Sequence, residues 1–116
     1  MAAVKQDFEM VRGDTKVLVF FVKGPDGLAL PLTGATVKWE AATSVHSETK
    51  DIAKSTAVGG VAIADADAGH VRVTLSPSDT SGLLLGRRYH ELEVTQSSGE
   101  VSTVSSGTMT LKPGLV

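Results

Sequence analysis

The sequence contains no cysteine and no long apolar run. Without cysteine there is no disulfide framework, no thiolate metal site and no cysteine nucleophile. No apolar stretch approaches the roughly 20 residues that a membrane-spanning helix needs, so we expect no membrane partner. The start of the chain, up to Asp7, also lacks the apolar core of a signal peptide. We therefore expect a protein that is made in the cytoplasm and stabilised by packing and hydrogen bonds.

An excess of basic charge is also missing. The chain has 11 lysines and arginines against 13 aspartates and glutamates, and its formal net charge is −2. Proteins that hold a phosphate backbone carry clustered positive side chains, and this sequence has no basic run. We therefore expect no nucleic-acid partner.

Aromatic residues are scarce, whereas β-branched residues are abundant. Five aromatic residues stand against 15 valines and 12 threonines. β-Branched side chains suit a pleated sheet better than a helix. A chain of 116 residues is the size of one domain. We expect a single all-β domain over residues 1–116 with a short N-terminal arm, and a core that includes Trp39 and Tyr89.

Short segments of strand character recur between glycine and proline turns. They lie at residues 7–11, 16–23, 35–42, 51–58, 61–64, 70–75, 87–96 and 101–111. Ser76 followed by Pro77 is typical of a helix start, and it predicts one short helical turn near residues 76–82. About seven to nine strands with frequent turns predict an antiparallel β-sandwich.

The segment from Lys16 to Lys23 is apolar on both of its faces. One face carries Val17, Val19 and Phe21, and the other carries Leu18, Phe20 and Val22. A strand with one wet face should alternate, so we expect both faces to be covered, the second by loops or by a neighbouring subunit. A register error of one residue exchanges the two faces. The assembly residues that we predict are Phe8, Leu18, Phe20 and Val22.

No catalytic constellation stands out. None of the three histidines, at 46, 70 and 90, has a second histidine at metal-ligand spacing. His90 shares a face with Leu92 and Val94, which is typical of a core histidine. No serine lies in a Gly-x-Ser-x-Gly elbow. We predict no catalytic residue, no metal site and no cofactor, and hence no enzyme.

Four further features have structural interpretations. The segment 65–69 resembles the start of a calcium loop, but Leu75 stands where that motif needs glutamate, which favours a solvated loop. Arg12-Gly13-Asp14 predicts a turn between strands. Glu91 and Glu93 are expected on an exposed face. We interpret Tyr89 as the buried ring of a tyrosine corner.

The order of the turn residues carries more information than any single motif. The first half has Arg12-Gly13-Asp14-Thr15, then Asp26-Gly27, then Leu32-Thr33-Gly34-Ala35-x-Val37. The second half has Gly69-x-Val71-x-Val73-x-Leu75-x-Pro77-x-Asp79-Thr80, then Gly86-x-x-Tyr89-x-Glu91-Leu92-x-Val94, then Ser98-Gly99-x-Val101-x-Thr103-Val104-x-x-Gly107. Over about residues 6–111 this set resembles the immunoglobulin-like domain at the N-terminus of tailed-phage baseplate upper proteins and of related small tail and fibre-attachment proteins.

The resemblance implies an immunoglobulin-like sandwich that serves as a bacteriophage virion structural protein. Its expected location is the virion, and its expected partners are other virion proteins and further copies of itself, in a trimeric or higher assembly. Because the sequence stops at Val116, we expect a tail, baseplate or fibre-adaptor subunit without a receptor-binding module. Two alternatives stay open. One is a capsid-surface or neck decoration protein. The other is a carbohydrate-binding or adhesion module, which an exposed Trp39 or Tyr89 in a groove would favour.

Overall fold

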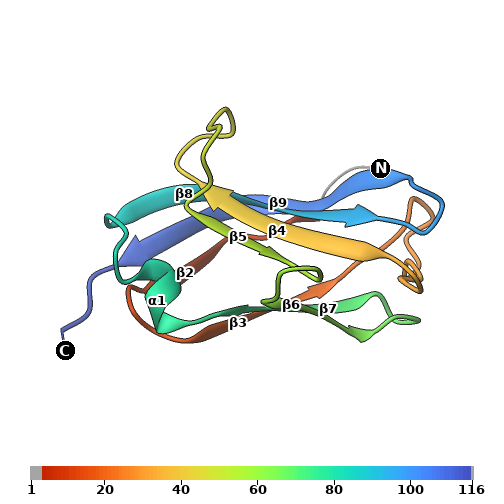
Figure 1. Ribbon diagram of the computed structural model, residues 1–116, viewed down its shortest axis with the longest axis horizontal. Helices are drawn as coiled ribbons and strands as arrows, with labels where there is room; N and C mark the ends of the chain where they lie inside the picture. The colour runs from red at the N-terminus through yellow and green to blue at the C-terminus, as the bar shows by residue number, and fades with distance from the viewer. Residues whose placement is uncertain (1–3, 116) are drawn as a thin grey trace.

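Two β-sheets packed face to face make up the computed structural model, which describes residues 4–115 (Figure 1). The larger sheet contains β1 (Val4–Lys5), β2 (Phe8–Val11), β4 (Thr36–Ala42), β5 (Ile52–Ser55), β8 (Gly86–Thr95) and β9 (Val101–Lys112). The smaller sheet contains β3 (Lys16–Phe21), β6 (Val61–Asp65) and β7 (His70–Leu75). One short helix, α1 (Pro77–Thr80), leads from the smaller sheet to the larger one. The predicted all-β sandwich with one helical turn is confirmed.

The strand order is that of an immunoglobulin-like sandwich. The larger sheet runs β1-β9-β8-β4-β5, with β2 also paired to β9, and the smaller runs β3-β7-β6. The neighbouring strands β9-β8-β4 correspond to strands G-F-C of immunoglobulin-like domains, and β3-β7-β6 correspond to strands B-E-D. The sandwich is antiparallel except at its N-terminal strands, because β1 and β2 run parallel to β9. The N-terminal segment has thus joined the larger sheet, and β3 ends the smaller sheet as an edge strand.

Alternation along the strands builds the core between the two sheets. Trp39 on β4 is fully buried, which is the position of the buried tryptophan in immunoglobulin-like domains. The largest apolar side chains that join it in full burial come from both sheets and from the loop before β4: Leu32, Leu75, Leu92, Met109 and Leu111. The prediction that Trp39 belongs to the core is confirmed.

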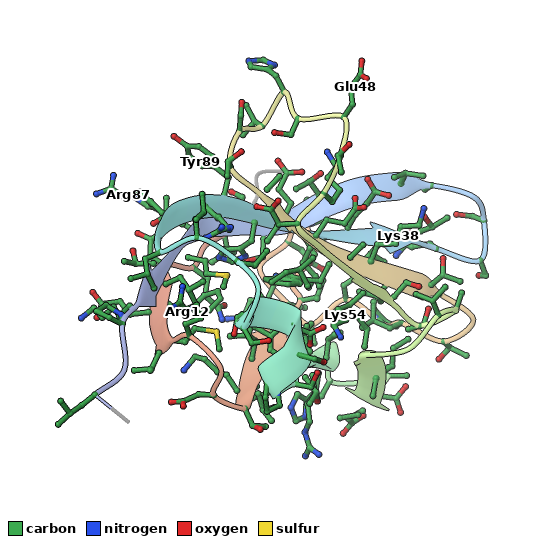
Figure 2. All side chains as sticks on the ribbon, turned by 60° about the vertical axis from the view of Figure 1, so that its left-hand side comes forward. Arg12, Lys38, Glu48, Lys54, Arg87 and Tyr89 are labelled. Atoms are coloured by element: carbon green, nitrogen blue, oxygen red, sulfur yellow. The ribbon has the colours of Figure 1, made fainter. Side chains whose placement is uncertain are left out.

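The corner helix is fixed by one carboxylate. The backbone N–H of Ser76 donates to Oδ2 of Asp79 at 2.7 Å, and Nζ of Lys54 on β5 lies 2.8 Å from the same oxygen (Figure 2). Partial burial raises the pKa of Asp79, but the hydrogen bonds from Lys54 and Ser76 outweigh burial and hold that pKa below its ordinary value. The helix start that the Ser76-Pro77 pair predicts is therefore anchored to the larger sheet.

Over residues 4–115, no helix has the length and apolar character needed to cross a membrane.

Candidate functional site

The outer face of the smaller sheet carries an exposed row of apolar side chains, which we call the apolar stripe: Val17, Val19 and Phe21. These three residues are 49%, 41% and 60% exposed. The predicted assembly residues on β3 and directly after it are instead core residues, since Leu18, Phe20 and Val22 are 4%, 2% and 3% exposed. The prediction that these residues form an assembly surface was therefore wrong, because they lie on the face that packs in the core. Both faces of the strand are apolar, so composition could not distinguish them.

Phe8, the fourth predicted assembly residue, lies on β2 of the larger sheet and is half-buried against the core. Its ring meets the His90 ring edge-on, with 5.1 Å between centroids. The Lys16 ammonium lies 5.9 Å from the Phe8 centroid. Phe8 therefore belongs to the packing of the sandwich and is not part of the apolar stripe.

Polar and basic side chains of β7 lie beside the apolar stripe. Phe21 lies opposite His70 of β7, and the two rings stack with centroids 4.8 Å apart. Val19 lies opposite Arg72, and Val17 lies opposite Thr74. Nε2 of His70 is buried and has no hydrogen-bond partner among residues 4–115. The expected cover by loops is missing over the described part of the chain, because all three stripe residues stay at least two-fifths exposed.

A second exposed region lies on the outer face of the larger sheet, beneath the loop of residues 43–51. A groove here is lined by residues of β4, β8 and that loop, among them Lys38, Glu40, Val45, Lys50, Tyr89 and Glu91. Tyr89 is 46% exposed and projects outward (Figure 2). Its interpretation as a buried tyrosine corner was wrong. Arg88, His90 and Leu92 take the inward positions of β8, so the period of two places Tyr89 outside.

An ion pair fixes the base of the same loop. Nε of Arg88, which is almost fully buried, donates to Oδ2 of Asp51 at 2.8 Å.

Glu40 and Glu91 lie directly opposite each other across β4 and β8, where like charges disfavour pairing of the strands. The groove thus combines an aromatic ring with two neighbouring carboxylates.

His90 is the buried polar link between three parts of the chain. Nδ1 lies 3.2 Å from Nε1 of Trp39, and Nε2 lies 2.7 Å from the Gln6 carbonyl oxygen. Because the indole N–H only donates and a carbonyl only accepts, the ring is neutral with its proton on Nε2. Burial lowers the pKa of His90 below its ordinary value, against the opposing effects of the Gln6 carbonyl and of Asp7. The prediction of a satisfied core histidine is confirmed.

The remaining motifs form turns, as predicted. Oδ1 of Asp65 accepts the backbone N–H groups of Asp67 at 3.1 Å and Ala68 at 3.2 Å, as expected for a turn-forming aspartate. Gly13 adopts a φ of 88° in the predicted turn after β2. Within residues 4–115, no three histidine, aspartate or glutamate side chains gather as a metal ion would need.

Comparison with known proteins does not assign the chain to a family. No model of a known protein family matches the chain, and no curated protein matches it significantly.

Proposed function

We propose that this protein is a virion structural subunit of a tailed bacteriophage, a small tail, baseplate or fibre-adaptor component that acts through protein–protein contacts in a symmetric assembly. The observation that carries the proposal is the exposed apolar stripe on a rigid immunoglobulin-like sandwich. The ordered turn motifs that resemble phage baseplate and fibre-attachment domains supply the type of assembly. The partners are other virion proteins and further copies of the chain. A decoration role on the capsid or neck would use the same contacts.

The physical reason is the cost of leaving such a face in water. Burial of apolar surface stabilises a contact by about 25 cal/mol per Å². Contiguous exposed apolar patches on small soluble domains mark interaction sites. Because the stripe lies on a paired strand, docking does not require a disordered segment to fold, and less conformational entropy is lost. Point-group symmetry then repeats one such contact around a particle.

Phe21→Glu is expected to weaken association about tenfold or more, because a charge replaces the most exposed apolar side chain of the stripe. The parent protein should form a defined oligomer by light scattering over a range of concentrations, and the variant should shift to the monomer. Folding should survive, since Phe21 is 60% exposed.

Leu84→Glu is the matched control, because Leu84 is 81% exposed and lies in the loop before β8, outside the stripe. It should leave the oligomer intact. A parent protein that stays monomeric at every concentration, or a Phe21→Glu variant that associates normally, contradicts the assembly role.

The virion location is tested by mass spectrometry of purified particles of the phage whose genome carries this sequence. Absence of the chain from those particles contradicts that part.

Carbohydrate binding is the second candidate function, and the exposed Tyr89 in its groove favours it. Aromatic rings beside polar groups bind the apolar faces and hydroxyls of sugars. The expected result is binding of the parent protein on a glycan array, with a loss of about tenfold or more in Tyr89→Ala. Val101→Ala, at a residue that is 55% exposed on β9, should bind normally. A blank array excludes this function.

A further inference from the structure

The backbone of β3 has a free hydrogen-bonding edge. The N–H of Val22 donates to the Gly69 carbonyl at 2.8 Å, which continues the pairing with β7. In an antiparallel ladder the alternate residues point their N–H and C=O groups the other way. Those residues are the apolar stripe, Val17, Val19 and Phe21. The Gln6 side chain confirms this orientation, because its Nε2 donates to the Val19 carbonyl at 3.1 Å from the open side.

Other sheet edges of the described chain are shorter or interrupted. β6 has a bulge between Ile63 and Asp65, and β5 has only four residues. β3 has six residues without a bulge, a proline or a glycine. A long, regular and apolar edge strand is the kind that adds a strand from another chain.

We propose that a second copy of this chain pairs along β3, antiparallel and across a two-fold axis, with Val19 of each copy opposite the other. The two three-stranded sheets then join into one sheet of six strands. This inference rests on the proposed function and deepens it, since it names the partner and the register of one contact in the assembly.

Side-chain complementarity selects this register. Pairing about Val19 places Val17 of each copy opposite Phe21 of the other, so that the two apolar stripes become one. A shift by two residues either way sets Phe21 opposite Thr15 or Val17 opposite Lys23, so that two apolar cross-strand pairs remain instead of three.

Charge complementarity favours the same register. Lys23 of each copy then lies opposite Thr15 of the other, next to Asp14. Both Lys23 and Asp14 are exposed, and neither has an ion-pair partner within residues 4–115. The two-fold axis repeats this approach of opposite charges. Like charges are kept apart, because Lys16 lies opposite the buried Val22.

Gln6 occupies the position that the second copy would take. Its amide must release the Val19 carbonyl when the Val19 N–H of the second copy donates to it. Two side-chain hydrogen bonds, one in each copy, are exchanged for two backbone hydrogen bonds at that residue pair. In a single chain the Val19 carbonyl of this edge is therefore capped by one side-chain hydrogen bond, which a second copy can displace.

The absence of cysteine allows a direct test by disulfide cross-linking. Residues that face each other in a hydrogen-bonded antiparallel pair have Cα atoms about 5.5 Å apart, within the range that a disulfide spans. Val19→Cys should form a covalent dimer under mild oxidation. Val17→Cys is the matched control on the same face, because the two Val17 residues would lie about 13 Å apart. We expect cross-linking about tenfold faster for Val19→Cys, and recovery in the double variant Val17→Cys/Phe21→Cys.

A charge exchange gives a second readout. Lys23→Asp and Asp14→Lys should each weaken the dimer, and the double variant should restore it. Equal cross-linking of Val19→Cys and Val17→Cys, or a double charge variant that stays weak, overturns the proposed pairing. If Phe21→Glu still dissociates the oligomer in that case, the stripe meets its partner face-on and the proposed function survives. If the parent protein is monomeric throughout, both proposals fall.

Discussion

Trp39→Ala is expected to lower the free energy of unfolding by about 3–5 kcal/mol. The side chain is fully buried between the sheets, and its indole N–H donates to Nδ1 of His90. Truncation leaves a large cavity and also leaves the buried ring of His90 without its donor. Domains of this size have a total stability of about 5–15 kcal/mol, so the loss is a large share of the whole. Urea unfolding followed by far-ultraviolet circular dichroism measures it, because the variant has no tryptophan to report by fluorescence.

Trp39→Phe separates the two causes. It keeps most of the ring volume but removes the N–H, and an unsatisfied buried acceptor costs about 1–3 kcal/mol. The free energy of unfolding of Trp39→Phe should therefore lie between those of the parent protein and of Trp39→Ala. Tyr89→Ala is the aromatic control, and its loss should be within about 0.5 kcal/mol because that ring lies on the surface. A loss for Trp39→Ala as small as that of Tyr89→Ala would show that β4 does not pack as described.

Gly69→Ala is expected to destabilise the fold by about 2–5 kcal/mol, from two separate costs. Gly69 has a φ of 65°, and a left-handed conformation costs a residue with a side chain about 1–2 kcal/mol. A Cβ at this position would also overlap the carbonyl oxygen of Val22 and lie 3.2 Å from that of Leu30. Relief of such an overlap by shifting the backbone costs about 1–3 kcal/mol more. The shift would disturb the hydrogen bond between the Val22 N–H and the Gly69 carbonyl.

Gly13→Ala isolates the conformational part of this loss. Gly13 has a similarly positive φ of 88°, but a Cβ there would meet no atom within 4 Å. Its loss should stay near about 1–2 kcal/mol. Thermal or urea unfolding of the two variants in parallel measures the difference. Equal losses would mean that the segment around Gly69 does not approach the chain after β3 as closely as the structure shows.

Local patterns identified most of the elements. The alternation of Val71, Val73 and Leu75 predicted the strand 70–75 with its observed bounds, because neighbouring residues of a strand face opposite sides wherever it pairs. The Ser76-Pro77 start predicted the corner helix, since helix starts depend on a few adjacent residues. The same alternation also placed His90 inside. Tyr89 was misjudged because the corner motif was preferred to the period of two, which places Tyr89 on the same face as Glu91.

Long-range pairing decided what the sequence left open. Residues 16–23 are apolar on both faces, so only packing against the larger sheet determines that Phe20 lies inside and Phe21 outside. Likewise, no local signal tells that β2 pairs with β9, more than 90 residues away in the chain, rather than with β3. The open edge of β3 follows from that choice. The sequence by itself determined the strands and their alternation, because these depend on neighbouring residues. Only the tertiary structure decided which face and which edge are exposed, because these depend on partners that are distant in sequence.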